Sequence, residues 1–80
     1  MLESKGTDSK GRVHAQIRVD SITRALEMHQ ELNRCMQRKE LVPYNNGHLR
    51  VVEVRLVSVL RTHGAQYHLV MAIGHRTEEL

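Results

Sequence analysis

The sequence predicts an α+β fold: a three-stranded antiparallel sheet with one amphipathic helix packed on one face. Two observations support this prediction. Three segments have the hydrophobic pattern of strands and one has the pattern of a helix, in the order strand, helix, strand, strand. A tight turn joins the last two strands. The first strand then lies most simply beside the third, which makes the strand order 2-3-1.

The chain has 80 residues, enough for one domain. Residues 1–11 are mostly polar, and we expect a flexible N-terminal arm followed by a single α+β domain over residues 12–80. One cysteine excludes an intrachain disulfide, and neither a membrane-spanning run nor a signal peptide is recognisable. These features predict a small soluble protein, located in the cytoplasm, with no membrane partner.

The first strand covers residues 12–19, where apolar and polar side chains alternate strictly. Its buried face consists of Val13, Ala15, Ile17 and Val19. Asp20 and Ser21 then supply an N-cap for a helix that we expect to end near Glu40. Pro43 prevents the helix from continuing. The apolar side of the helix consists of Ile22, Ala25, Leu26, Met28, Leu32, Cys35 and Met36.

Two further strands, residues 48–61 and 66–76, form a hairpin. We expect a two-residue turn at His63–Gly64, which pairs Thr62 with Ala65. This register directs Tyr67 toward the helix. It leaves an apolar group on the helix-free face, made of Val57, Val59, Val70 and Ala72. A slip of one residue would exchange the two faces of a strand.

These four side chains are the interface candidates, because one helix cannot cover both faces of a sheet. The long strand 48–61 also offers an unpaired edge to which another subunit could add a strand. We therefore expect a self-associating binding or assembly domain, a dimer or larger homo-oligomer, with room for a small ligand at the subunit interface. The alternative is a bulge that twists the long strand until both of its faces reach one core.

Nucleic-acid binding is a second hypothesis, since the predicted outward face carries several basic side chains. The candidates are Arg12, His14, Arg18, Arg55, His68 and Arg76. The formal net charge of +3 is mild, and no helix is basic enough for insertion into a major groove. The face also lacks an aromatic platform for base stacking if Tyr67 points inward. Nucleic acid is therefore the less favoured partner.

No combination of residues predicts catalysis. The six histidines lack the spacing of a metal site, so we predict neither a metal nor a cofactor. His29 lies on the apolar side of the helix, where a structural histidine is the ordinary interpretation and a general base is the alternative. Cys35 points away from His29 around the helix and does not form a nucleophile pair with it. The sequence predicts no enzyme.

The β-α-β-β order, the size and the last strand, which runs Tyr67-His-Leu-Val-Met-Ala-Ile-Gly-His-Arg-Thr-Glu-Glu79, resemble the dodecins. Dodecins are small proteins that assemble into hollow shells and store flavin. The resemblance implies an oligomeric binder of a flavin-type small molecule as a further alternative. The resemblance in the order of the elements covers residues 12–79, and the resemblance in amino-acid sequence covers only the last strand. Dodecins stack flavin on a tryptophan in the strand after the helix, and this chain has no tryptophan.

Overall fold

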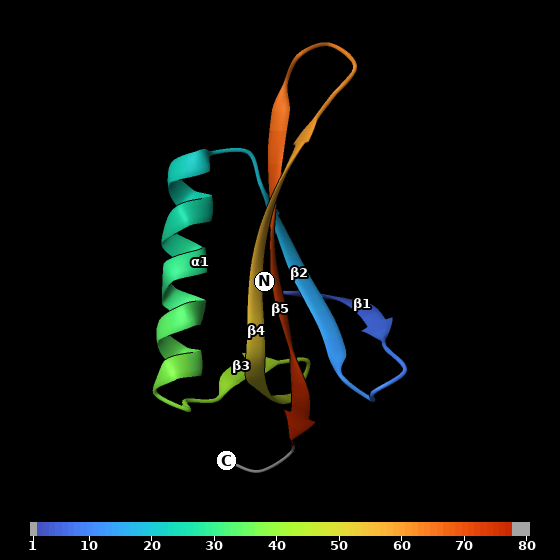
Figure 1. Ribbon diagram of the computed structural model, residues 1–80, viewed down its shortest axis with the longest axis vertical. Helices are drawn as coiled ribbons and strands as arrows, with labels where there is room; N and C mark the ends of the chain where they lie inside the picture. Colours follow the sequence, from blue (N-terminus) through green and yellow to red (C-terminus); the bar gives the residue numbers. More distant parts are fainter. Residues whose placement is uncertain (1, 78–80) are drawn as a thin grey trace.

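The protein forms one antiparallel sheet of five strands and one helix in the computed structural model, which describes residues 2–77 (Figure 1). Its elements are β1 (Glu3–Thr7), β2 (Val13–Val19), α1 (Ile22–Gln37), β3 (Val42–Tyr44), β4 (Gly47–Leu60) and β5 (Gln66–Thr77). The strand order across the sheet is β1-β2-β5-β4-β3. The last three residues of the predicted domain, 78–80, lie outside the described residues.

The prediction of a three-stranded sheet with the order 2-3-1 is wrong, because two short strands extend the sheet at its edges. β1 pairs with β2, and it lies within the segment that we expected to be a flexible arm. β3 pairs with the beginning of β4. Both strands are too short to show an alternating pattern, and β3 contains Pro43, which the sequence presents as a helix terminator. An edge strand tolerates proline because one of its sides needs no hydrogen-bond donor.

The turn between β3 and β4 is a two-residue hairpin loop. Tyr44 pairs with Gly47, and the residues between them, Asn45 and Asn46, have φ angles of 44° and 64°. Two consecutive left-handed residues define the type I′ turn that two-residue hairpins prefer, and asparagine accepts this conformation readily. The strand β4 therefore begins directly after this turn.

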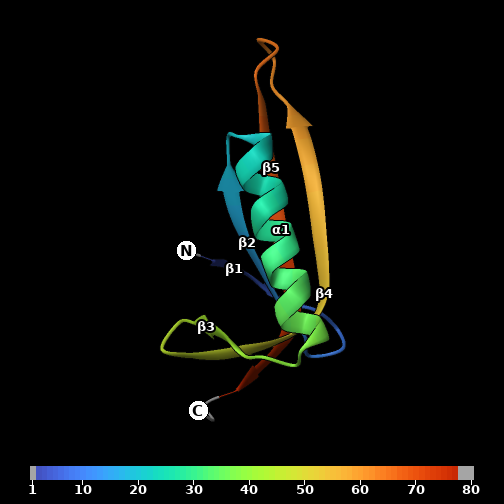
Figure 2. The same ribbon diagram turned by 90° about the vertical axis from the view of Figure 1, so that its left-hand side faces the viewer.

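The helix α1 begins as predicted, with the backbone N–H of Arg24 donating to the N-cap oxygen of Ser21. Figure 2 shows α1 lying across the sheet, with β2 on one side of it and β4 on the other. Its most deeply buried side chains are Ala25 and Leu32, which join the core cluster. No helix within residues 2–77 is long and apolar enough to cross a membrane.

The hairpin between β4 and β5 has a three-residue loop, Thr62-His63-Gly64, where we expected two residues. The backbone N–H of Arg61 donates to the carbonyl of Ala65 at 2.7 Å, and the N–H of Gly64 donates to the carbonyl of Arg61 at 3.0 Å. Gly64 has a φ of +82°. A turn followed by a left-handed glycine is the usual form of a three-residue hairpin loop.

The longer loop shifts the pairing of β5 by one residue relative to our prediction. Leu69 faces Val57, and Val70 faces Leu56. Because side chains alternate between the two sides of a strand, the shift exchanges the faces of β5. Val70 and Ala72 consequently lie beneath α1, and each is 0% exposed. The expected register and the expected placement of these two side chains are wrong for this single reason.

A bulge bends β4 near its start, where the register with β5 shifts between Val51 and Glu53. Gly74 pairs with Val51 at this point, and a Cβ atom on Gly74 would lie 2.1 Å from the carbonyl oxygen of Arg50. Only glycine permits the two backbones to approach so closely. The bend curls the sheet around the core beneath α1 (Figure 2).

Candidate interaction surface: the helix-free face of the sheet

The side of the sheet that faces away from α1, here called the open face, has an apolar floor on β4 and β5. The register places the following side chains on it: Val57, Val59, Tyr67, Leu69, Met71 and Ile73. Val57 is 42% exposed, and Leu69 and Met71 are only half-buried. An apolar floor of this kind remains partly accessible because the helix covers the other side of the same strands.

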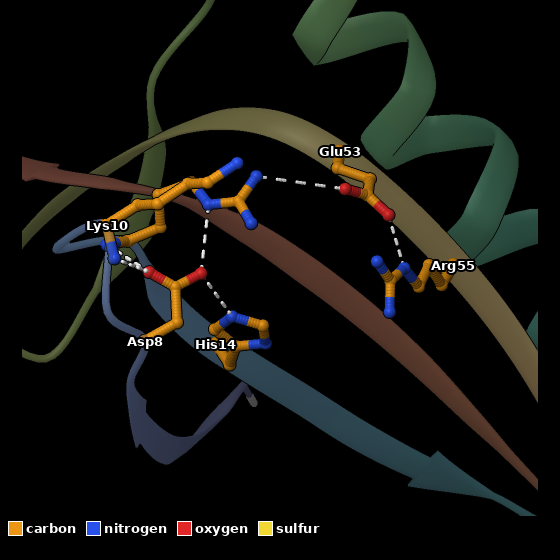
Figure 3. A network of polar contacts seen from close by, with 6 residues as sticks. Asp8, Lys10, His14, Glu53 and Arg55 are labelled. Carbon is orange, nitrogen blue, oxygen red and sulfur yellow. Dashed lines mark hydrogen bonds and ion pairs between the residues drawn. The ribbon is translucent and has the colours of Figure 1, made fainter.

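A polar network borders the floor at the end of the sheet near β1 (Figure 3). The Asp8 carboxylate accepts hydrogen bonds from the backbone N–H groups of Lys10 (2.9 Å) and Arg12 (3.0 Å). Arg12 Nε also donates to Asp8, and His14 Nε2 lies 2.9 Å from Asp8 Oδ2. The hydrogen bond with His14, followed by those from Arg12, holds the pKa of Asp8 well below its ordinary value.

The network continues across β5 to β4. Arg12 Nη1 lies 3.9 Å from Glu53 Oε1, and Glu53 accepts a hydrogen bond from Arg55, which is the main reason that its pKa is lowered. Ile73 pairs with His14 on one side and Glu53 on the other, so the Arg12–Glu53 contact spans the strand at this side chain. This cover explains why Ile73 is 0% exposed although it faces away from the helix.

The other end of the open face carries a tyrosine held by two arginines. The guanidinium carbon of Arg18 lies 4.2 Å from the centre of the Tyr67 ring, and that of Arg61 lies 5.0 Å from it. Both distances are within the range of cation–π attraction. Each guanidinium also lies 3.9 Å from Asp20 Oδ1. The ring of Tyr67, at the start of β5, is therefore held by arginines at the ends of β2 and β4.

The predicted interface candidates divide into two pairs. Val57 and Val59 lie on the open face. Val70 and Ala72 do not, because they belong to the buried core. The sequence analysis missed the β5 side chains that do line the face, namely Tyr67, Leu69 and Met71. No sequence signal identifies them, because a glycine at position 64 fits a two-residue loop as well as the three-residue loop that the structure has.

The predicted ligand and nucleic-acid candidates divide as well. The structure brings together Arg12, His14, Arg18 and Arg55 around the open face. His68 lies on the helix side instead, where it is 4% exposed and its Nδ1 atom lies 2.7 Å from Ser58 Oγ. Arg76 lies near the β3–β4 turn, where it donates to the carbonyl of Asn45. Neither of these two side chains reaches the open face.

The two helix residues considered for catalysis, His29 and Cys35, have surroundings that do not activate them. His29 Nδ1 lies 3.2 Å from the amide nitrogen of Asn33, one turn along the helix. Desolvation, with smaller contributions from Glu31 and Glu40, raises the pKa of the Cys35 thiol. A raised pKa makes the thiolate, which is the nucleophilic form, scarcer. In the part of the chain that the structure describes, no three metal-binding side chains gather to form a site.

The charges around the open face are largely neutralised within the chain. Arg12 is paired with Asp8, and Arg55 with Glu53. Asp20 lies close to both arginines that contact Tyr67. The surface is thus an apolar floor inside a border of paired charges, a combination that is common in protein–protein interfaces. A polyanion-binding surface would instead have a marked excess of unpaired cations.

Comparisons with protein-family models, curated proteins and solved structures found no match to this chain. The resemblance to the dodecins therefore rests on the residues quoted above and on the order of the elements.

Proposed function

We propose that this chain is a self-assembling domain whose open face forms the contact between copies. The observation that supports this proposal is the accessible apolar floor, centred on Val57 and Leu69, on the side of the sheet that α1 does not cover. Burial of such a floor contributes roughly 25 cal/mol for each Å² of apolar surface removed from water. Association is the simplest way for a chain of this size to obtain that stabilisation.

A second copy suits the open face because the border of the face is self-complementary. It carries guanidinium groups at both ends, on Arg12 and Arg61, and a carboxylate beside each, on Asp8 and Asp20. A two-fold axis brings the same patch of both subunits together, so each copy can present its cations to the carboxylates of the other. Like charges are then not forced into contact.

Native mass spectrometry of the intact chain tests the proposal. Leu69→Glu places a charge in the middle of the floor, and we expect it to reduce the assembled mass while circular dichroism shows retained helix and strand. Gln30→Glu, which adds the same charge on an exposed part of α1, serves as the control and should leave the assembly intact. An unchanged assembly of folded Leu69→Glu would contradict the proposal. Any additional mass retained by the wild-type assembly would identify a ligand held between subunits.

Binding of single-stranded nucleic acid is the second candidate, and the placement of Tyr67 favours it. This side chain, which the sequence analysis expected to point inward, places an aromatic ring on the open face, with the cations Arg18 and Arg61 against it. Fluorescence anisotropy with a labelled oligonucleotide provides the test. Binding by the wild-type chain should weaken steeply between low and moderate salt. At a given salt concentration, Tyr67→Ala should bind the oligonucleotide more weakly than the wild-type chain does. No binding at low salt would exclude this candidate.

A further inference from the structure

The outer edge of β4 is free along most of its length. β3 pairs with β4 only at Gly47–Leu49, so residues 50–60 have no strand beside them within the described chain. Residues 54–60 follow the bulge and pair with β5 without a register shift. A long, regular and uncovered edge is the feature that natural domains usually shorten, charge or cover. This edge is therefore suited to accept a strand.

The hydrogen bond from the Arg61 N–H to Ala65 determines which backbone groups point outward. Arg61 directs its N–H toward β5, and in an antiparallel pair this direction alternates along the strand. The N–H and C=O groups of the following residues consequently point away from β5, toward the free edge: Val54, Leu56, Ser58 and Leu60. Four successive outward-pointing residues can form a ladder with another strand.

Exposed apolar side chains also gather along this edge. Within residues 2–77, the large hydrophobic residues with the most exposed surface are Ile22 (46%), Leu26 (52%), Val52 (43%), Val57 (42%) and Leu60 (69%). Three of them belong to β4 and two belong to α1. All five thus belong to β4 or to α1, with Val57 on the open-face side of β4 and Leu60 on its helix side.

The orientation of α1 places its two residues above the β4 edge. Met28 lines a depression with Ile17 of β2, whereas Met36 lines one with Val52 of β4. At about 100° per residue, Ile22 and Leu26 lie on the Met36 side of the helix. Their side chains therefore flank the free edge and lie away from β2.

We propose that β4 pairs antiparallel with β4 of a second copy, with Val57 of each chain on the two-fold axis. The proposal rests on the proposed self-assembly and assigns a second contact to it, made by the backbone edge of β4, whereas the first is made by the side chains of the floor. Val57 is the midpoint of the regular segment 54–60. In this register Leu56 pairs with Ser58 of the other copy, and Val54 pairs with Leu60. Every outward-pointing backbone group then meets another outward-pointing group.

The same register is complementary in charge. Glu53 of one chain lies opposite Arg61 of the other, and the two-fold axis repeats the pair at the far end of the seam. Both side chains lie on the open-face side of β4, so they can approach one another directly. Between the two pairs, five of the seven residues on each strand are apolar, and the exceptions are Arg55 and Ser58. This self-complementarity favours a second copy over an unrelated strand.

The helices reinforce the seam. An axis perpendicular to the sheet keeps both helices on the same side, running antiparallel. Each α1 contacts mainly β4 and β5. Strand spacing then separates the two helix axes by roughly 10–14 Å. Leu26 and Ile22 of the two copies point into this gap. Their side chains meet across it when the two helix axes are ~8–10 Å apart, which is the separation typical of packed helices.

Disulfide cross-linking tests the register. In a Cys35→Ser background, Val57→Cys places two thiols opposite each other across the axis, with Cβ atoms about 5 Å apart. Val59→Cys is the matched control on the same face, because its two copies are separated by about 13 Å along the seam. Under mild oxidation we expect Val57→Cys to form covalent dimers roughly tenfold faster than Val59→Cys. Equal rates would overturn the register, since contact through the open face alone brings both positions close to the partner.

A proline substitution tests the backbone ladder. The N–H of Ser58 points to the free edge, so Ser58→Pro removes no hydrogen bond to β5 but blocks strand addition. Ser58→Ala is its control, because it removes the contact with His68 and keeps the N–H. We expect Ser58→Pro, and not Ser58→Ala, to reduce the assembled mass. If the proline variant is unfolded by circular dichroism, the cross-linking rates decide the question.

The two contacts can fail separately. A wild-type assembly that Leu69→Glu dissociates, and in which Val57→Cys does not cross-link preferentially, would contradict the β4 seam and leave the open-face contact in place. Preferential cross-linking that persists in the combined Leu69→Glu variant would support the seam alone. A monomeric wild-type chain would contradict both.

Discussion

The two ends of the sheet differ in how completely the single chain covers them. At the end near β1 and β3, both edges of the sheet carry a short strand, and Ile73 is 0% exposed beneath the polar network of Asp8, Arg12 and Glu53. At the hairpin end, β4 has a free edge and Leu60 is 69% exposed. Figure 1 shows the β4–β5 hairpin extending beyond the end of α1 at this side.

The difference shows that a sheet needs two kinds of cover: side chains or a helix over each face, and hydrogen-bond partners for the backbone groups along its edges. The chain supplies these at one end through short strands and charged side chains. At the hairpin end it supplies charged side chains around Tyr67 but, within residues 2–77, no additional edge strand, and the exposed apolar side chains there are the ones that a second copy would bury.

The largest contrast should be between two leucines of α1. Leu32 is 7% exposed in the core, and Leu32→Ala should lower the free energy of unfolding by about 3 kcal/mol. Leu26 is 52% exposed, and Leu26→Ala should lower it by less than about 0.5 kcal/mol when the chain is dilute and monomeric. Urea denaturation across a range of protein concentrations measures both. If Leu26→Ala loses more unfolding free energy at high protein concentration than at low, Leu26 is buried by association. Equal losses for the two variants in the dilute chain would contradict the difference in burial.

The next largest effect should come from Gly74, where β4 bends. Gly74→Ala places a Cβ 2.1 Å from the Arg50 carbonyl, so the backbones must separate, at a cost of about 2 kcal/mol. Gly11→Ala is the control. Gly11 has a φ of +76° but open space around it, so its replacement costs only the strain of that backbone conformation, about 1 kcal/mol. Thermal or urea unfolding that finds Gly74→Ala no worse than Gly11→Ala would contradict the close approach.

The smallest effect should be the dependence of stability on acid pH. The pKa values of Asp8 and Glu53 are lowered in the folded chain from ordinary values of 3.8 and 4.5. Below those ordinary values the unfolded chain binds more protons than the folded chain, so the free energy of unfolding falls as pH falls. Urea midpoints at about pH 6 and pH 3 measure this loss. The Asp8→Asn, Glu53→Gln double variant should show a smaller loss, and an equal loss would place the titrating groups elsewhere.

The candidate surface shows how far sequence reasoning extends. The alternation of β2 correctly separates its buried side chains from Arg12, His14 and Arg18, because only one of its faces is apolar. The same reasoning fails in β5, where the run Tyr67–Ile73 is apolar on both sides except at His68. A pattern without alternation cannot determine which side faces the helix.

The sequence by itself determined the start of α1 at Ser21, the three long strands and the division of polar and apolar side chains along β2, because capping and alternation are local properties. Only the tertiary structure decided the rest. The loop geometry at Gly64 set the register and hence the open face. The two short edge strands pair through local hairpins but are too short to show an alternating pattern, and the Arg12–Glu53 contact joins segments that are distant in sequence.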